Sequence, residues 1–385
     1  MTHTRPVWAE ISRRKLLHNY RILEDLAGPD AQLVAVIKAD AYGHGLEACA
    51  RALAADGSRW LGVTSVEEAV RLRGSCPEAR ILAMSGAWRG EADAVIDARL
   101  TPVVWDRDHV EMLREAATRR GVSSGALPVH VEIDSGMSRQ GVQPENLTAL
   151  LEDLRGAPPL RVEAAMTHFH SPGDASATGE QMRRFGAAVG LMIGAGIQPE
   201  YFSAGSSADL LDQSTREITE LAKRHSARRM VRSGLALYGY APQGGRDYGL
   251  QPVLAWKTRV VSLREIEAGA VAGYGATFRA VRPTRLALLA VGYADGLNRG
   301  LSNRGSVLVR GQKAPIAGRI SMDQTMVDVT EIAGVSVEDE VVLIGEQGEA
   351  SITADDLARE TGTIAYEVLC DLSARVPRII VDERA

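Results

Sequence analysis

Lys38 is the residue of this chain best placed for chemistry. It stands in VAVIKADAYGHG, near the carboxyl end of an otherwise apolar run. A lysine at such a strand end loses solvation, which favours the neutral amine that Schiff-base chemistry needs. The alternative is a lysine that packs its stem on the strand and extends its ammonium to water. The glycines of Tyr42-Gly43-His44-Gly45 weigh against that alternative, because they let the backbone approach a ligand closely.

Two short loops are candidates for phosphate binding. Gly205-Ser206-Ser207 and Ser233-Gly234-Leu235 stand near the carboxyl ends of the last two of eight predicted strands. Their small residues expose backbone N–H groups and hydroxyls, and parallel barrels often hold a phosphate with these two loops. Each loop alone is also explained as a tight turn that needs glycine. Their occurrence together at the two expected positions favours a phosphate site.

Metal chemistry has little support in the sequence. His168-Phe169-His170 places two histidines on one segment, but no third ligand stands at a metal-binding spacing. Cys49, Cys76 and Cys370 are widely spaced and odd in number, which fits neither a zinc site nor a disulfide framework. We therefore expect no metal.

The elements that must position these residues follow a regular alternation up to about residue 240. A helix is expected over 65–73, where Ser65-x-x-Glu68 forms a capping box, and another over 179–196. Eight strand-then-helix units predict a (β/α)8 TIM-type barrel, since an open doubly wound sheet seldom repeats so often. The eight predicted strands cover residues 34–40, 60–65, 80–86, 100–106, 129–134, 162–169, 201–207 and 230–237.

The remainder of the chain predicts a second, mostly β domain. After residue 245 short β-rich runs such as RLALLAVGYADG and EVVLIGEQG alternate with glycine-bearing turns. We expect a barrel domain over 1–245 and a β-rich domain over 246–385, with about the first ten residues free to pack on the second domain.

The composition of the chain limits the kinds of molecule that it can be expected to bind. The chain has 385 residues, 45% hydrophobic content and a net charge of -5, which argues against a nucleic-acid binder. No apolar stretch approaches the roughly 18–20 residues that cross a bilayer, and the first residues contain no signal-peptide core. A cytoplasmic enzyme with a small-molecule substrate is expected.

The motifs together resemble the alanine racemase family. AVIKADAYGHG is similar to the cofactor-lysine motif of that family, and seven further segments match in order across nearly the whole chain. They are DSGMSRQGV, MTHFH, RRMVRSGLALYGYAP, AGYGATFRA, VGYADG, GRISMDQTMVDVT and YEVLCDLSARVPR. The resemblance implies racemisation of L- and D-alanine with pyridoxal 5'-phosphate, which supplies D-alanine for peptidoglycan.

By the same resemblance, Lys38 carries the cofactor as a Schiff base and acts as the base on one face of the substrate, and Tyr274 acts on the opposite face. Inversion of a stereocentre needs an acid–base group on each side, because a single base tends to return the proton to the same face. In the family this tyrosine reaches into the partner subunit's barrel, so a homodimer with shared active sites is implied.

The resemblance also assigns supporting roles. Arg232 faces the pyridine nitrogen of the cofactor, His168 supports that arginine, and Arg139 contacts the phenolic oxygen and the substrate carboxylate. The phosphate contacts are Tyr42, Ser206, Gly234 and Leu235. Met322 and Asp323 belong to the substrate pocket across the dimer interface, and Tyr293 matches an entry-channel tyrosine; ordinary interface roles remain an alternative for Asp323 and Tyr293.

Two positions depart from the family pattern. Glu132 stands where many alanine racemases have a lysine, commonly carbamylated, that orients the arginine matching Arg139. We expect the Glu132 carboxylate to replace the carbamate, although a partly solvated strand carboxylate is the alternative. Ala374 stands where the family usually has a tyrosine that touches the phosphate and narrows the pocket mouth, so a wider pocket is expected.

Three alternative functions remain. A non-catalytic cofactor-binding barrel would lack the second domain that carries Tyr274 and Met322. A basic amino-acid decarboxylase would share the lysine but not AGYGATF followed by GRISMDQ. A broad-specificity or serine racemase is suggested by Ala374, although those enzymes often carry a secretion signal.

Overall fold

The computed structural model describes residues 4–212, 216–241 and 247–381, which form two compact units. We call residues 16–39 and 46–250 the barrel unit, and residues 1–15, 40–45 and 251–385 the β unit. The predicted boundary between residues 245 and 246 lies outside the described residues. In the part of the chain that the structure describes, no helix is both long and apolar enough to cross a membrane.

Eight parallel strands close into a ring in the barrel unit, which confirms the predicted (β/α)8 barrel. The last strand pairs with the first, as Val34 opposite Arg232 illustrates. The strands are β2 (Ala31–Val36), β3 (Trp60–Val63), β4 (Arg80–Ala83), β5 (Thr101–Val104), β6 (Leu127–Glu132), β7 (Leu160–Met166), β8 (Tyr201–Ser203) and β9 (Arg228–Ser233).

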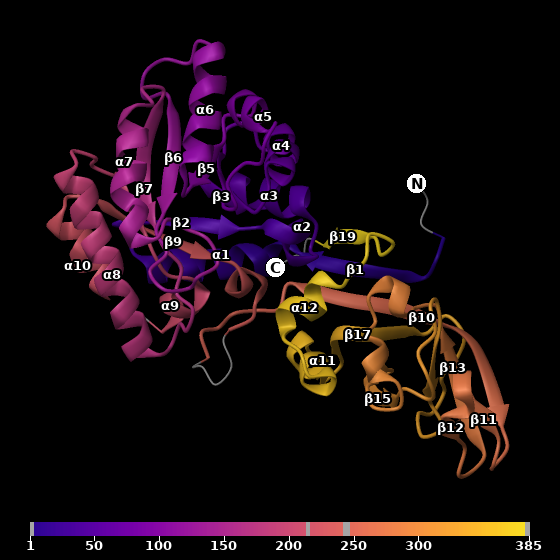
Figure 1. Cartoon of the computed structure of the whole chain (residues 1–385). Coiled ribbons are helices and arrows are strands. Elements are labelled where there is room, and N and C mark those ends of the chain that lie inside the picture. The colour runs from indigo at the N-terminus through magenta and orange to yellow at the C-terminus, as the bar shows by residue number, and fades with distance from the viewer. Residues whose placement is uncertain (1–3, 213–215, 242–246, 382–385) are drawn as a thin grey trace. The chain divides into compact units, whose positions relative to one another are not determined.

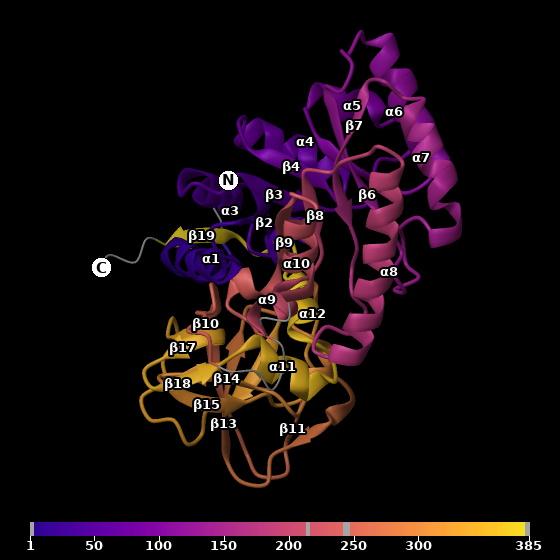
Figure 2. The same cartoon turned by 90° about the vertical axis from the view of Figure 1, so that its left-hand side faces the viewer.

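Helices surround these strands on the outside of the barrel (Figures 1 and 2). They are α3 (Leu46–Ala55), α4 (Val66–Ser75), α5 (Ala92–Asp97), α6 (Arg107–Arg119), α7 (Leu147–Arg155), α8 (Ala175–Gly194), α9 (Ser207–Leu211) and α10 (Arg216–Arg224), with short 3-10 turns η1 (Pro144–Asn146) and η2 (Leu235–Tyr238). α1 (Arg13–Ala27) begins in the β unit and continues in the barrel unit. Each helix turns an apolar side to the strands; in α10 the buried residues are Ile218, Leu221 and Ala222.

The inside of the barrel is filled by side chains of different sizes. Trp60 and Tyr201 alternate with small residues such as Ala164, so the interior is a packed core and not a channel. The cluster comprises Val34, Trp60, Leu82, Val103, Ala164, Met166, Tyr201 and Met230.

The capping box predicted at Ser65 is present at the start of α4. The Ser65 hydroxyl accepts the Glu68 N–H at 3.2 Å, and the Glu68 carboxylate accepts the Ser65 N–H at 3.4 Å. These reciprocal bonds satisfy two of the donors that a helix N-terminus leaves unpaired.

The β unit is mostly strand, as predicted. A mixed sheet has the order β15-β14-β17-β10-β1-β19; β13 pairs with β10 and β16, and β18 pairs with β17. Its strands are β1 (Val7–Ser12), β10 (Leu254–Ile266), β13 (Thr284–Leu289), β14 (Ser306–Val309), β15 (Gln312–Pro315), β16 (Thr325–Asp328), β17 (Glu340–Gln347), β18 (Ala350–Ile352) and β19 (Arg378–Val381). The remaining elements are the hairpin of β11 (Val271–Ala272) and β12 (Phe278–Arg279), the 3-10 turns η3 (Tyr274–Ala276), η4 (Tyr293–Asp295) and η5 (Arg299–Leu301), and helices α11 (Ala354–Thr361) and α12 (Ala365–Cys370).

The N-terminal strand is part of this sheet. β1 pairs antiparallel with β10 and parallel with β19. Its alternating buried residues Val7, Ala9 and Ile11 enter the core of the β unit.

Candidate active site

Most of the predicted barrel residues lie just beyond the carboxyl ends of strands. Lys38 is two residues past the end of β2, His168 two past β7, and Gly234 and Leu235 directly follow β9. Because parallel strands of a closed barrel all end on the same face, these residues gather at one end of the barrel unit. This is the end where barrel enzymes build their active sites.

The chain turns left-handed immediately after Lys38. Ala39, Asp40, Ala41 and Tyr42, the rest of α2 (Lys38–Tyr42), all have φ between 52° and 56°. Such backbone costs L residues on the order of 1–2 kcal/mol each, so other contacts must hold it. One is a hydrogen bond of 2.7 Å from the Ala39 N–H to the Glu68 carboxylate.

The end of this turn is fixed within the β unit. The His44 ring is fully buried, and its Nδ1 lies 2.8 Å from the Tyr42 carbonyl, so Nδ1 carries the proton and donates. Burial lowers the pKa of His44 to about 4. Gly43 cannot be replaced, because a Cβ there would lie 2.1 Å from the Leu369 carbonyl oxygen. Arg378 Nε donates to the Gly43 carbonyl at 2.8 Å.

Arg232 is a buried cation at the carboxyl end of the barrel. Its Nη1 donates to the Ser203 hydroxyl at 2.7 Å and to the Ser203 carbonyl at 3.2 Å. Its Nη2 donates to the Thr167 carbonyl at 2.8 Å and to His168 Nδ1 at 3.2 Å. These bonds use all four Nη hydrogens, and Nε–H is the one donor of the guanidinium with no partner among the described residues. The predicted pairing of His168 with Arg232 is therefore present.

His168 is neutral at physiological pH. Burial lowers its pKa to about 3, and the positive charges of Arg232, Arg139 and Lys38 act in the same direction. Since Arg232 can only donate, the neutral imidazole accepts at Nδ1 and keeps its proton on Nε2. The environment of His168 is thus strongly cationic.

Glu132 is the buried carboxylate of this region. It accepts a hydrogen bond from the Gln140 amide, which also donates to the Met84 carbonyl at 3.0 Å. Burial raises the pKa of Glu132, while the Gln140 bond and the charges of Arg232 and Arg139 oppose that rise. Glu132 thus contacts the residue after Arg139 and acts on the Arg139 charge through space.

The two candidate phosphate loops are tied together by serines. The Ser207 hydroxyl lies 2.9 Å from the Ser233 hydroxyl and accepts the Gly234 N–H at 3.0 Å. The Ser206 hydroxyl donates to the Asp209 carboxylate at 2.9 Å, in the capping box of α9. The loops after β8 and β9 therefore lie side by side, and the Ser206 hydroxyl and the Gly234 N–H have partners within the protein.

The site candidates of the β unit are exposed. Tyr274 is 70% exposed, on a turn between Gly273 and Gly275, both with positive φ; Met322 is 53% and Tyr293 42% exposed. Other large exposed apolar side chains of this unit are Val271, Val281, Val337, Ile364, Tyr366, Ile379 and Ile380.

A charged network holds the segments that carry Tyr293 and Met322. Asp295 is fully buried and accepts two bonds of 2.8 Å from Arg5 and one of 3.0 Å from the Gly292 N–H. Arg375 Nε lies 3.4 Å from Asp295, and its Nη2 lies 2.6 Å from Asp323. Ala374, which directly precedes Arg375, is exposed.

Several contributors were not identified from the sequence. Ser203 and Thr167 hold Arg232, Gln140 holds Glu132, and Glu68 holds the turn after Lys38. The only signal for any of them was the capping box that contains Glu68. Among the described residues, no three His, Cys, Asp or Glu side chains form a group that could hold a metal ion.

Both units match family models. Residues 11–242 match the alanine racemase N-terminal domain, and residues 253–380 match the alanine racemase C-terminal domain. The chain belongs to the alanine racemase family. This confirms the resemblance drawn from the sequence motifs.

Individual relatives agree over the full length. The alanine racemase of Sorangium cellulosum is 40% identical over 385 residues, covering 97% of this chain and 98% of the relative. That of Halothermothrix orenii is 38% identical over 379 residues, covering 97% of each. The solved structure of alanine racemase from Bartonella henselae, with covalently bound pyridoxal phosphate, is 29% identical, covers 98% of this chain and 99% of that one, and has a TM-score of 0.83.

Proposed function

We propose that this chain interconverts L- and D-alanine with pyridoxal 5'-phosphate as its cofactor. The observation that carries the proposal is the placement of Lys38, His168 and Arg232 at the carboxyl ends of the barrel strands, with Arg232 Nη2 3.2 Å from His168 Nδ1. Relatives that match nearly the whole chain are named alanine racemases, and the solved structure of one relative contains covalently bound pyridoxal phosphate.

The donor set of the barrel unit fits this cofactor. The cations of this region outnumber its two buried carboxylates, Glu132 and Asp209, which suits a ligand that carries negative charge on a phosphate and a phenolic oxygen. Ser206 and the Gly234 and Leu235 amides would hold the phosphate, together with Tyr42. The Ser206 hydroxyl and the Gly234 N–H would exchange their present partners, Asp209 and Ser207, for the phosphate oxygens. When bound, the cofactor supplies a carbonyl that reacts with an amine and a conjugated ring that takes up negative charge from Cα.

Arg232 would tune that ring. Its Nη hydrogens are engaged by Ser203, Thr167 and His168, so Nε–H is the donor available to a ring nitrogen. Arginine does not give up its proton at ordinary pH, so a nitrogen that accepts from it stays unprotonated. The ring then withdraws electrons only weakly, which favours simple return of the proton to Cα.

Two bases would move that proton. Lys38 Nζ would remove or return it on one face, and Tyr274 Oη would do so on the other. Arg139 would hold the substrate carboxylate, with its charge balanced by Glu132, and Met322 would line the substrate pocket. Asp323 and Tyr293 would support the substrate pocket indirectly, through the contacts of Arg375 with Asp323 and Asp295.

We further propose that the working form is a homodimer with shared active sites. Tyr274 and Met322 are 70% and 53% exposed in one chain, and a group that acts in a water-excluded site must be covered. Other exposed apolar side chains of the β unit, including Tyr366 and Ile364, supply apolar area for that contact. The barrel over 1–245 would hold the cofactor, and the β-rich domain over 246–385 would complete the partner's site.

A mixed-dimer experiment tests these roles together. Lys38→Ala and Tyr274→Ala should each be inactive alone. After unfolding and refolding of an equal mixture, half of the dimers are mixed and each has one intact site, so activity should return to about one quarter of the wild-type level. A mixture that stays inactive, although cross-linking shows mixed dimers, would exclude shared sites. A Lys38→Ala protein with wild-type racemisation would exclude the role of Lys38, and a wild-type protein that racemises no alanine after pyridoxal 5'-phosphate is added would exclude the function itself.

A broader substrate range is the second candidate function. It rests on Ala374, which presents a methyl group at an exposed position where the family usually has a tyrosine.

A cytoplasmic supply of D-alanine for peptidoglycan is the proposed physiological role. The odd, widely spaced cysteines fit a reducing compartment, and fractionation of cells with an antibody against the chain would test the location.

A further inference from the structure

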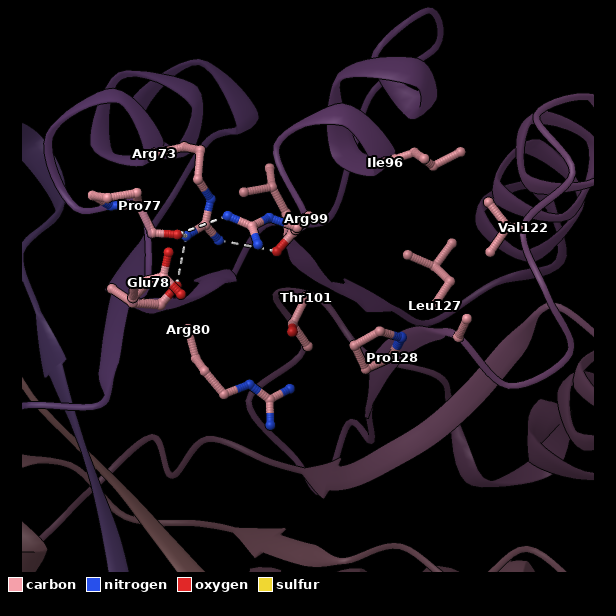
Figure 3. Close-up of a pocket in the computed structure, with 13 residues that line it drawn as sticks. Arg73, Pro77, Glu78, Arg80, Ile96, Arg99, Thr101, Val122, Leu127 and Pro128 are labelled. Carbon is pink, nitrogen blue, oxygen red and sulfur yellow. Dashed lines mark hydrogen bonds between the residues drawn. The ribbon is translucent and has the colours of Figure 1, made fainter.

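A cavity of about 390 Å³ opens at the amino-terminal end of barrel strands β4, β5 and β6 (Figure 3). The first residue of each strand lines it: Arg80, Thr101 and Leu127. Lys38 and Arg232 lie at or beyond the carboxyl ends of their strands, so the cavity is at the opposite end of the barrel from the proposed active site. Its volume lies in the lower part of the range of small-molecule sites, roughly 300–1,000 Å³.

The cavity has one polar and one apolar side. Figure 3 shows Arg73 and Arg99 beside Pro77 and Glu78 on one side, with Arg80 and Thr101 between the two. The other side is formed by Ile96, Val122, Leu127 and Pro128. A ligand that fits both sides has a charged end and an apolar body.

Arg73 builds the polar side and is not available to a ligand. Its Nε donates to the Ala98 carbonyl at 2.7 Å, and its Nη2 to the Arg99 carbonyl at 3.1 Å. Its Nη1 donates to the Pro77 carbonyl at 2.7 Å and to the Ala79 carbonyl at 2.8 Å. Arg73 therefore ties the loops before β4 and β5 together around the cavity.

Near the cavity, the other arginine side chains outnumber the carboxylates. Arg80 Nη2 donates to both oxygens of the buried Glu163, at 2.9 and 2.7 Å, and the guanidinium stacks on Trp60 with its centre 4.1 Å from the ring. Arg161 also donates to Glu163 at 3.0 Å, so one carboxylate serves two arginines. Glu78 is the one carboxylate among the described residues that line the cavity.

Arg99 adds a second cation to the lining of the cavity. Its φ of 50° places it in the left-handed region, and its Nη2 donates to the Pro77 carbonyl at 2.8 Å. That single bond leaves most of the donors of its guanidinium without a partner among the described residues. The excess of positive charge selects an anion, and the planar guanidiniums suit a carboxylate.

We propose that this cavity binds a small amphipathic carboxylate, with its charged end at Arg80, Arg99 and Thr101 and its apolar body against Ile96, Val122 and Leu127. The site is separate from the alanine site and needs none of the residues proposed for catalysis. The proposed ligand differs from alanine because it has no ammonium group. The cavity offers only one carboxylate, Glu78, that could bind an ammonium group.

Calorimetric titration of the cofactor-loaded, full-length enzyme tests the proposal. Sodium hexanoate and sodium benzoate are titrated with alanine present at saturation, which occupies the catalytic carboxylate site. We expect one bound carboxylate per chain, and at least about tenfold weaker binding of hexanamide, which has the same shape without the charge. Equal binding of hexanoate and hexanamide would overturn the proposal, and so would the absence of binding by either carboxylate at about 10 mM.

A cavity-filling variant locates the binding. Ala126 is exposed and lines the cavity, so Ala126→Phe should fill it and reduce hexanoate affinity at least about tenfold. Ala187→Phe, an exposed alanine of α8 away from the cavity, is the matched control and should bind hexanoate as the wild type does. Both variants should keep the wild-type kcat/KM for alanine, which shows that they are folded. Hexanoate binding that is unchanged in Ala126→Phe would place the ligand elsewhere and refute the assignment.

Discussion

The carboxylate of Glu68 joins the cofactor-lysine turn to a helix start: its Oε1 lies 2.7 Å from the Ala39 nitrogen, and its Oε2 lies 3.0 Å from the Thr64 nitrogen. The same side chain completes the capping box of α4 with Ser65. One residue therefore satisfies backbone donors in two segments. The left-handed backbone after Lys38 depends on this contact because non-glycine residues do not adopt it spontaneously.

We expect Glu68→Ala to destabilise the chain by about 1–2 kcal/mol, because it removes a helix cap and leaves the Ala39 N–H without its partner. It should lower kcat for alanine more than it changes KM, since Lys38 would be less well positioned. Urea unfolding and steady-state kinetics measure the two effects. Glu67→Ala, at the exposed neighbouring position, is the control and should be nearly neutral; equal effects of the two variants would contradict the positioning role.

Acid should destabilise the protein through buried neutral histidines. The pKa of His44 is lowered to about 4 by burial, so between pH 4 and about 6.5 the unfolded chain binds a proton that the folded chain does not. Stability is therefore full above about pH 6.5 and falls as pH decreases, by about 2 kcal/mol at pH 5 from this residue. His168, with a pKa of about 3, acts in the same direction.

The histidine prediction is checked by urea unfolding at pH 7.5 and pH 5. His44→Asn keeps a donor near the Ala41 and Tyr42 carbonyls but does not titrate, so its loss of stability between the two pH values should be smaller than that of the wild type. His170→Asn, at an exposed position, should leave the pH dependence unchanged. If His44→Asn and the wild type lost equal stability, the buried histidine would not be the cause.

Glu132 should supply the negative charge that many relatives take from a carbamylated lysine. We expect racemisation to be indifferent to removal of bicarbonate and CO2, and Glu132→Ala to lower kcat/KM roughly 100-fold through loss of a buried charge near Arg139. Gln140→Leu, which removes the hydrogen-bond partner of Glu132 but leaves its carboxyl group in place, should have a smaller effect. Unchanged kinetics in Glu132→Ala would assign Glu132 an ordinary structural role.

Ala374 should widen the range of substrates. We expect Ala374→Tyr to increase the preference for alanine over serine and larger amino acids by about 10- to 100-fold, which corresponds to the 1–3 kcal/mol that an apolar wall discriminates. The measurement is kcat/KM for alanine, serine, lysine and arginine in both proteins. Identical ratios would show that position 374 does not limit the pocket. Ala333→Tyr, at an exposed position of the β unit away from the site candidates, controls for the added ring.

The sequence alone determined the architecture and the main candidates for chemistry. Eight apolar runs separated by helical segments predicted the barrel, and Ser65-x-x-Glu68 predicted the start of α4. Both depend on local patterns of apolar and polar residues, and a strand or helix expresses such patterns directly. Lys38, Ser206 and Gly234 could be placed at strand ends for the same reason.

Only the tertiary structure decided how those residues are held. The left-handed turn at Ala39–Tyr42 contains no glycine, so no local preference announces it, and contacts from Glu68 and Arg378 stabilise it. Gln140 became the partner of Glu132, and Arg5 became the partner of Asp295 across 290 positions. A hydrogen bond between distant residues depends on the packing of whole elements, and single-sequence patterns do not record that packing.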